Sequence, residues 1–483
     1  MSESERVNLQ EEHAHPPSSV CHNCEEILNM MNNQMASVTE IKNLLQEVQL
    51  QNTELIKQIS HVHKDNDKET TCCSRLTIYK TAFMLFLTLL SIVIYRLSIA
   101  TPEKYYSFAT GEGLKLATVD ERATVILHVM DVKGKAYTVT EEAMICELAS
   151  DMKSMYFKKL KCSVQKNESG QYEISYQPTS RRRHQLHIKV EGDHIIGSPF
   201  SVIVLNKLST PTNIISGVAA PQGIAFNKNG DIFVAEYRGH SVSVFCPSGE
   251  KLQSFGSKGS ELGQFNHPCA IAVDDDGNVL VADGKNHRIQ KFTSEGKFIT
   301  AAGRLGTNPL EFDFPVGIGI HPHTKKMYIM ENKNHRIQIL NPDLSFHKMF
   351  GSHGKGEGQF NEPKDVAFDS IGNVYVADNE NHRIQVFTKE GDFLRQFGKE
   401  VKGEGELNYP TGISITSDDV LYVTELYNYR VSVFTSDGVF LKSFGRQGNE
   451  PGQFIDPRGI AVDENGTVYV SDHGNNRIQL FGL

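Results

Sequence analysis

The stretch that decides the fold is Asn334-His335-Arg336-Ile337-Gln338, because it recurs along the chain at a nearly constant spacing. Residues 286–290 and 381–385 repeat it letter for letter, and degenerate copies stand at 239–243, 428–432 and 476–479. The arginines of the clearer copies lie at positions 288, 336, 383, 430 and 477, in steps of 48, 47, 47 and 47 residues. Such a period indicates one supersecondary unit that is copied several times.

A proline near the start of each copy shows that there are six copies. These prolines follow one another in steps of 47 or 48 residues and are Pro221, Pro268, Pro315, Pro363, Pro410 and Pro457. Short β runs with alternating apolar residues follow each proline and are separated by glycine-containing turns. The pattern predicts a six-bladed β-propeller over 207–483, with copies near 218–265, 266–312, 313–360, 361–407, 408–454 and 455–483.

The sixth copy is shorter than the others, since the sequence ends after its third β run. A spare β run at 212–216 precedes the first copy. We expect this run to supply the outermost strand of the sixth blade and to close the ring, because closure removes exposed sheet edges.

Residues 103–206 precede the propeller and predict a separate β domain. Ala123, Val125, Leu127 and Val129 alternate with polar residues, and runs at 172–176 and 186–190 do the same. Short alternating strands over about a hundred residues favour an immunoglobulin-like sandwich. Cys146 and Cys162 lie in this domain and become candidates for a disulfide if the domain is extracellular.

Both β regions resemble known families. Gly170-x-Tyr172-x-x-x-Tyr176-x-Pro178 and Gly197-Ser198-Pro199-Phe200 resemble a filamin-type repeat, and the propeller copies resemble NHL repeats. The order of a coiled coil, a filamin repeat and an NHL propeller resembles the tripartite-motif (TRIM) proteins that end in NHL repeats. The resemblance implies that ubiquitin-ligase activity would need an N-terminal zinc-binding RING. Met1 to Cys24 has neither the length nor the ligands for one, so we expect no enzymatic activity in this chain.

The first hundred residues predict a disordered segment at 1–19 and a coiled coil at 20–64. Apolar residues repeat there with the 3-4 spacing of a heptad seam, from Met31 to Val62, and Asn52 is a polar member of the seam. An isolated amphipathic helix is the alternative. Cys21 and Cys24 form a C-x-x-C pair without a second ligand pair, so we interpret them as two thiols and expect no metal site.

Residues 76–100 predict a single transmembrane helix. Fifteen uncharged, mostly apolar residues lie between Lys80 and Arg96, and apolar flanks extend the run toward the length that a bilayer requires. A buried linking helix is the alternative. More lysines and arginines lie before the helix than after it, which favours a type II orientation with lumenal or extracellular C-terminal domains. If the helix does not span, the protein is cytoplasmic.

Two kinds of modification site depend on that orientation. Cys72 and Cys73 would lie beside the membrane and are candidates for palmitoylation, with two unmodified thiols as the alternative. Asn167 and Asn465 each begin an Asn-x-Ser/Thr sequon, which becomes usable only if the C-terminal part is lumenal.

An acidic residue stands five positions before the arginine in each complete copy. We expect carboxylate and guanidinium to pair across the intervening turn, in the structural pairs Asp283–Arg288, Glu331–Arg336, Asp378–Arg383, Glu425–Arg430 and Asp472–Arg477. The first copy has Ser241 in place of the arginine, so Arg238 is the expected substitute partner of Glu236. His240, His287, His335 and His382 share one register and would be spread around the ring, so we expect a structural role rather than a metal site.

Positions that differ between copies are better candidates for function. In a propeller, the loops before each proline and the loops before each Asn-His-Arg segment build one face. The candidate binding face consists of Tyr237, Arg238, Lys285, Lys333, Lys364, Tyr427, Arg458 and His473.

Basic and aromatic residues on such a face are compatible with RNA, which some NHL relatives bind. Residues 211–483, however, contain 26 Lys and Arg against 33 Asp and Glu, and this balance disfavours RNA. The favoured hypothesis is a membrane-anchored protein that forms a homo-oligomer through its coiled coil and binds a protein or peptide without a cofactor. A ubiquitin-pathway adaptor that pairs with a RING-bearing relative and an RNA-binding regulator remain the alternatives.

Overall fold

The computed structural model describes residues 105–131, 133, 135–150, 160–167, 171–399, 403 and 405–482. The segment predicted to be disordered at 1–19, the coiled coil at 20–64 and the membrane helix at 76–100 lie outside these residues. In the part of the chain that is described, no helix has the length and apolar character that a membrane crossing requires.

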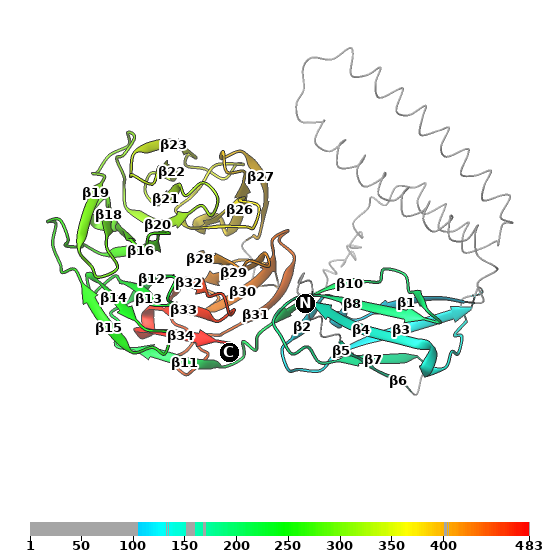
Figure 1. The fold of residues 1–483 in the computed structure, drawn as a ribbon. Helices are drawn as coiled ribbons and strands as arrows, with labels where there is room; N and C mark the ends of the chain where they lie inside the picture. The colour runs from blue at the N-terminus through cyan, green and yellow to red at the C-terminus, as the bar shows by residue number, and fades with distance from the viewer. Residues whose placement is uncertain are drawn as a thin grey trace, which may run out of the picture. The chain divides into compact units, whose positions relative to one another are not determined.

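Residues 105–205 form the predicted β-sandwich of two sheets (Figure 1). The first sheet has the order β1 (Tyr105–Thr110), β3 (Ala123–Asp131), β7 (Tyr172–Tyr176) and β6 (Ser163–Lys166). The second has the order β2 (Leu116–Thr118), β10 (Phe200–Leu205), β8 (Arg182–Val190), β4 (Met144–Ser150) and β5 (Leu160–Lys161), with β9 (Asp193–His194) paired to β8. Two 3-10 turns, η1 (Glu112–Leu114) and η2 (Glu141–Ala143), connect the strands.

A disulfide joins Cys146 and Cys162 within this sandwich, and their Cα atoms are 5.3 Å apart. Cys146 lies in β4, and Cys162 directly follows β5, its antiparallel neighbour. Adjacent strands bring the two Cα atoms within the distance that a disulfide spans.

Residues 211–481 form the predicted six-bladed propeller, and each blade is a four-stranded antiparallel sheet. From the inner strand outward, the blades are β12 (Pro221–Phe226), β13 (Ile232–Glu236), β14 (Ser241–Phe245), β15 (Lys251–Phe255); β16 (Pro268–Val273), β17 (Val279–Asp283), β18 (Arg288–Phe292), β19 (Phe298–Ala302); β20 (Pro315–Ile320), β21 (Met327–Glu331), β22 (Arg336–Leu340), β23 (Phe346–Phe350); β24 (Pro363–Phe368), β25 (Val374–Asp378), β26 (Arg383–Phe387), β27 (Phe393–Phe397); β28 (Pro410–Ile415), β29 (Val420–Glu425), β30 (Arg430–Thr435), β31 (Phe440–Phe444); and β32 (Pro457–Val462), β33 (Val468–Asp472), β34 (Arg477–Phe481), β11 (Pro211–Ser216).

The ring is closed by β11, which precedes the first blade in sequence and pairs antiparallel with β34 of the sixth. Ile215 lies opposite Ile478 in this pairing. The inner strand β12 also contacts the inner strand β32, so the first and sixth blades are neighbours. The segment at 212–216 therefore occupies the place that the sequence assigns to it, and the sixth sheet has the same number of strands as the others.

A buried carboxylate ends the second strand of every blade, and in five blades it binds the arginine of the repeated segment. The carboxylates of these five pairs are fully buried, and the Nε–O distances are 2.9 Å (Arg288–Asp283), 2.6 Å (Arg336–Glu331), 2.7 Å (Arg383–Asp378), 2.7 Å (Arg430–Glu425) and 2.7 Å (Arg477–Asp472). In blade four, the Asp378 carboxylate also accepts hydrogen bonds from the Asn361 backbone N–H, from Asn381 and from Gln385.

The terminal nitrogens of the same arginines bind backbone carbonyls. In blade two, Arg288 donates from Nη1 to Ser260 O and from Nη2 to Glu261 O and Gln264 O, each at 2.8 Å. These carbonyls belong to the loop between β15 and β16, which leads into the inner strand of the same blade. The arginine therefore joins the carboxylate to this loop through its Nε and its terminal nitrogens.

The first blade lacks the arginine and is held differently. Glu236 accepts hydrogen bonds from the Ala219 backbone N–H and from the Ser243 hydroxyl. Its ion-pair partner is Lys251, with Nζ 4.0 Å from Oε1. Arg238, the partner expected from sequence, lies in an exposed loop beyond the strand end, so this expectation is wrong.

Four histidines of the repeated segment connect successive blades. Each has a left-handed backbone with φ between 51° and 55°. Each Nδ1 accepts a hydrogen bond from the backbone N–H just before the next blade's proline, in the pairs His240–His267, His287–Phe314, His335–Glu362 and His382–Tyr409, at 3.0–3.2 Å. The Asn476 side chain accepts the equivalent bond from the Ala220 N–H at 2.9 Å. The residues at this shared position therefore form hydrogen-bonded joints between successive blades.

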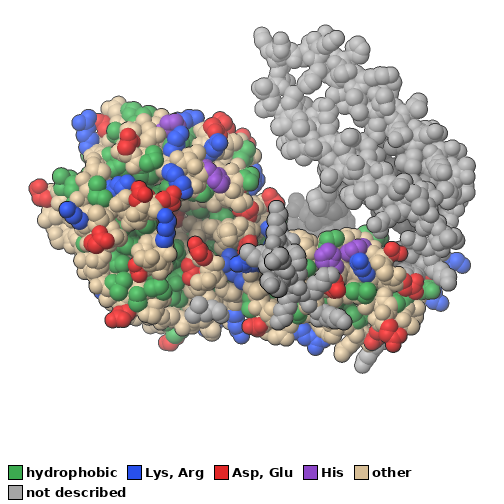
Figure 2. Space-filling view, in the orientation of Figure 1, with side chains coloured by type: hydrophobic (Ala, Val, Ile, Leu, Met, Phe, Trp, Pro, Cys, Tyr) green, Lys and Arg blue, Asp and Glu red, His purple; other side chains and the backbone are tan. Residues whose placement is uncertain are grey.

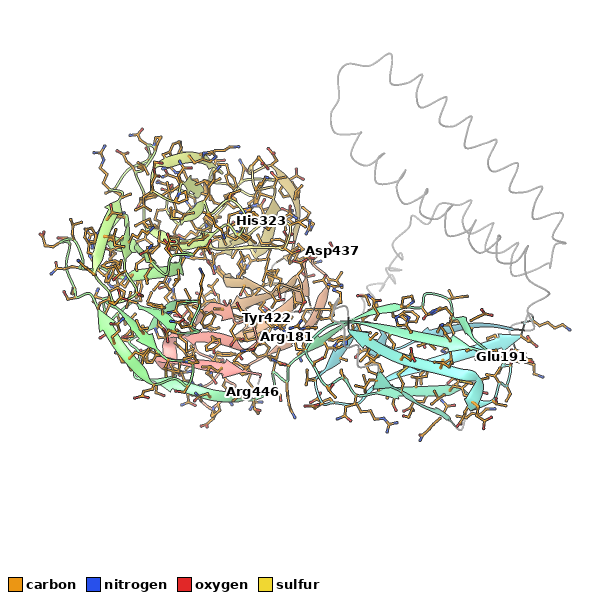
Figure 3. All side chains as sticks on the ribbon, in the orientation of Figure 1. Arg181, Glu191, His323, Tyr422, Asp437 and Arg446 are labelled. Carbon is orange, nitrogen blue, oxygen red and sulfur yellow. A yellow bond between two sulfur atoms is a disulfide. The ribbon has the colours of Figure 1, made fainter. Side chains whose placement is uncertain are left out.

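The third blade explains the single step of 48 residues. One additional residue lies between Pro315 and Arg336 compared with the other blades, in the turn at 321–326. His321 is buried in this turn, where its Nδ1 accepts the His323 N–H and its Nε2 donates to Gly372 O of blade four. His323, which lies in this turn, is labelled in Figure 3. The additional residue is accommodated in a turn and leaves the strands in register.

We predict that Asp378→Ala destabilises the protein more than Glu236→Ala does. Removal of Asp378 leaves the Arg383 guanidinium, only 8% exposed, without its carboxylate, and such a loss costs about 3–5 kcal/mol. Removal of Glu236 leaves only hydrogen-bonding partners and the half-exposed Lys251, at a cost of about 1–3 kcal/mol. Urea unfolding of the two variants, followed by circular dichroism, measures the difference. Equal losses would contradict the central role of the arginine pair.

We further predict that the propeller loses stability in mild acid. Burial, together with Lys258 near His240 and His353 near His335, lowers the pKa of both histidines below 6.5 in the folded protein. The stability that they contribute is therefore complete above pH 6.5 and is lost as the pH falls through their lower folded pKa. The melting temperature, measured between pH 7.5 and 5, should fall. The double variant His240→Asn with His335→Asn places the residue type of Asn476 at both positions and should reduce this fall. If the double variant keeps the pH profile of the wild type, the histidine hydrogen bonds are not the cause of the acid sensitivity.

Candidate binding face and central channel

The loops between the second and third strands lie beside the loops that precede the inner strands. Backbone N–H groups of Arg238, Lys285 and Lys333 donate to Ala219 O, Asn266 O and Asp313 O, at 3.0–3.3 Å. We call the surface formed by these two sets of loops the loop face. All eight candidate residues lie in these loops or at the second residue of an inner strand, so they lie at this face.

The tips of the loops between the second and third strands differ from blade to blade. Arg238, Lys285 and Lys333 occupy this register in blades one to three and are exposed. The same register holds Glu380, Tyr427 and Gly474 in blades four to six. We call the three consecutive cations the basic arc. It is a local feature, because Figure 2 shows Lys and Arg side chains interspersed with Asp and Glu over the visible side of the propeller.

One carboxylate brings two of the candidate lysines together. Glu362 binds Lys333 Nζ through Oε1 at 2.5 Å and Lys364 Nζ through Oε2 at 3.2 Å. Burial alone would raise the pKa of Glu362, but the two lysines lower it to about 2. Burial lowers the pKa of Lys364, and the charge of Glu362 opposes that shift. Blades three and four are thus joined by a three-membered charge cluster on the loop face.

A second group surrounds Asp456 at the joint between blades six and one. Arg458 binds Asp456 through two hydrogen bonds of 2.9 and 3.0 Å. His473 is buried, and its Nδ1 donates to Pro221 O at 3.2 Å. Burial and the nearby Arg458 lower the pKa of His473 to about 4, so it is neutral at physiological pH. Among the eight candidates, His473 is thus placed as a link between blades rather than on the accessible surface.

The two candidate tyrosines lie in separate aromatic groups. The Tyr237 ring packs on His267 at 4.5 Å and on His473 at 5.8 Å. The Tyr427 ring packs on Tyr409 at 4.7 Å and remains 53% exposed. The candidates therefore form several small groups around the ring, and Tyr427 is the aromatic residue among them that is most available to a partner.

The six inner strands enclose a central channel of about 380 Å³ that opens between these groups. The residue after each proline forms its entrance ring: Gln222, Cys269, Val316, Lys364, Thr411 and Arg458. Cys269 is fully buried in this ring, and burial raises the pKa of its thiol to about 12. The thiol is therefore protonated and unreactive at neutral pH.

The next residue of each inner strand forms a second ring, in which sequence reasoning missed one residue. The ring contains Gly223, Ala270, Gly317, Asp365, Gly412 and Gly459. The Asp365 carboxylate accepts the backbone N–H groups of Ile413 and Val366, at 3.0 and 2.9 Å. Burial raises its pKa to about 7. The signal was available, because only one copy carries a charge at this register, but its position inside the channel follows from the fold.

Several other candidate sites are placed by the structure. Asn465 is exposed in the turn between β32 and β33, and Asn167 is half-buried after β6. Cys72 and Cys73 lie outside the described residues. Within the described ranges, no three His, Cys, Asp or Glu side chains come together as metal ligands would.

Two protein-family models match the chain. A Filamin/ABP280 repeat matches residues 101–201, and the NHL repeat matches 219–245, 265–292, 360–387, 407–434 and 454–481. The chain thus contains a filamin repeat followed by NHL repeats, as the sequence motifs predict. The third blade, with its additional turn residue, lies outside the matched segments. An NHL propeller indicates a domain that binds protein or RNA.

Curated relatives share a limited part of the chain. E3 ubiquitin-protein ligase TRIM71 of Xenopus tropicalis is 33% identical over 153 residues, which make up 29% of this chain and 18% of that protein. TRIM71 of Mus musculus is 32% identical over 153 residues, which make up 29% of this chain and 17% of that protein. The chain is thus distantly similar to TRIM71 and spans less than a fifth of its length.

Solved structures match the chain at low sequence identity. A streptogramin B lyase has 15% identity and a TM-score of 0.43, over 56% of this chain and 97% of that chain. A structural genomics protein of unknown function from Bacteroides thetaiotaomicron has 14% identity and a TM-score of 0.47, over 79% and 99%. Similarity at this level carries no argument about activity.

Proposed function

We propose that this protein is a non-enzymatic interaction scaffold whose loop face binds a protein or peptide. The observation that carries the proposal is the basic arc, which together with the exposed Tyr427 stands on an otherwise repeating framework. A repeated framework fixes the loops, and the side chains that differ between blades supply specificity. Arginine and tyrosine are both frequent among residues that dominate binding energy, and the arc favours an acidic partner.

The charge balance favours protein over RNA as the ligand. Residues 211–483 carry a net charge of −7, from 26 Lys and Arg and 33 Asp and Glu. Lys333 is also partly neutralised by Glu362. RNA binding gains most of its affinity from cations that replace counterions on phosphates, and a negative propeller offers few of them.

We further propose that the segment at 76–100 anchors the protein in a membrane, that the coiled coil at 20–64 oligomerises it, and that the filamin repeat is a spacer. Several propellers on one membrane would raise avidity without new contacts. The Cys146–Cys162 disulfide supports a type II orientation, since disulfides persist in oxidising compartments. Participation in the ubiquitin pathway is the second candidate, because the similar proteins are named as E3 ligases. That role would require a RING-bearing partner.

We predict that reversal of the basic arc abolishes partner binding. The triple variant carries Arg238→Glu, Lys285→Glu and Lys333→Glu. The amount of each acidic protein that co-purifies with it should be at least tenfold lower than with the wild-type chain, because the attraction for an acidic partner is removed. The matched control carries Lys297→Glu, Lys325→Glu and Lys389→Glu, which make the same charge change in turns at the opposite ends of the strands.

Quantitative mass spectrometry measures the proteins that co-purify with each triple variant, and ultraviolet crosslinking measures bound RNA in parallel. Equal losses in the two triple variants would contradict the loop face. Recovery of RNA that depends on the basic arc would replace the protein ligand with RNA.

We predict that the expressed protein is N-glycosylated at Asn465. The side chain is exposed, so it is accessible to modification if the propeller is lumenal. Glycosidase treatment should increase the electrophoretic mobility of the wild-type chain, and Asn465→Gln should remove that shift. Asn167→Gln is the companion variant for the other sequon. A chain with no shift in either form would contradict the type II orientation.

A further inference from the structure

Asp365 is a half-buried carboxylate that lines the central channel, and no cation of the described residues forms an ion pair with it. Its two oxygens accept backbone N–H groups of Ile413 and Val366. Among the described residues, burial and these two hydrogen bonds are the influences that act on it. A buried carboxylate that lacks a partner charge is costly. Its presence therefore calls for a reason other than stability.

The other copies show which residue the framework itself requires at this register. A Cβ on Gly459 would lie 1.8 Å from Gln222 O, and a Cβ on Gly412 would lie 2.3 Å from Arg458 O. Glycine at these two positions thus lets neighbouring inner strands approach, whereas Ala270 adds only a methyl group at the same register in blade two. Asp365 departs from that solution in blade four alone and places two acceptor oxygens in the channel.

The Asp365 carboxylate gives the channel an acceptor with a negative charge. Each of its oxygens accepts one backbone N–H, and a carboxylate oxygen can accept more than one hydrogen bond. Asp365 therefore suits a ligand that donates several hydrogen bonds, and an ammonium group does so with a matching charge.

The entrance ring supplies the complementary charge. Lys364 and Arg458 line the channel and are held at its mouth by Glu362 and Asp456. Arg458 uses Nε and Nη2 for Asp456, and a guanidinium has five N–H donors in total. Both cations thus keep donors for a further acceptor. Lys364, Asp365 and Arg458 are the charged residues that line the channel, and Cys269 is the remaining titratable one.

We propose that the central channel binds a small zwitterion, with its ammonium group toward Asp365 and its carboxylate toward Lys364 and Arg458. The volume of about 380 Å³ is at the lower end for ligand sites, which span roughly 300–1,000 Å³. The ligand is either a free amino acid or the C-terminal residue of a peptide. In the second case the inference rests on the proposed function, since the peptide belongs to the protein partner.

Calorimetry on the full chain tests the site with unbranched ω-amino acids from glycine to 6-aminohexanoate. We expect at least one of them to bind. Hexylamine and hexanoate, which each carry one of the two charges, should bind tenfold or more weakly. Asp365→Asn and Asp365→Gly should each lower the affinity tenfold or more. Asp365→Gly carries the residue of the other copies, so it should fold. Ser414→Ala, which alters an uncharged lining residue, should bind as the wild type does.

Peptides separate the two sources of the ligand. A peptide that ends in lysine is compared with the same peptide as its C-terminal amide, and selective binding of the free acid assigns the site to a protein terminus. Failure of every zwitterion and of the acid peptide to bind at millimolar concentration would overturn the proposal, as would wild-type affinity in folded Asp365→Gly. Unchanged partner binding in the arc variant would contradict the proposed function, whereas loss of zwitterion binding alone would contradict the channel site, so the two failures are distinguishable.

Discussion

A buried carboxylate at the end of each second strand is the interaction on which the propeller depends. In blade four, the Asp378 carboxylate gathers donors from a side chain of its own turn, from the third strand and from the loop that enters the blade. Because the charge is buried, these donors cannot be withdrawn without a large cost. The hydrogen bonds that satisfy the carboxylate therefore also fix both loops of the loop face.

The framework holds together between blades by a second set of polar bonds. Each of the four histidines accepts a backbone N–H from the following blade, and Asn476 does the same across the closure between blades six and one. Apolar inner strands alone would allow blades to slide, whereas a directional hydrogen bond at five of the six junctions sets the relative height of the blades. The polar residues of the repeated Asn-His-Arg segment thus stabilise the framework, and the loop tips are the positions that differ between blades.

The sequence predicted much of the fold and part of the candidate site. The period gave the six blades, and the spare run at 212–216 gave the closing strand. The eight candidate residues lie in the chosen loops or at the second residue of an inner strand, and their role in binding stays a prediction. His473 shows what loop membership leaves undecided: its ring turns inward and binds Pro221 O. Lys251 rather than Arg238 pairs with Glu236, because the strand places Lys251 beside the carboxylate although it is farther away in sequence.

By itself, the sequence determined the repeating unit, the number of blades and the strand that closes the ring, because side-chain alternation and turn residues act over a few neighbouring positions. Only the tertiary structure decided which side chains meet across blades. Glu362 joins lysines of two blades, and Asp365 faces a channel built by all six inner strands. Such contacts depend on the curvature and closure of the ring, which bring together residues of different blades.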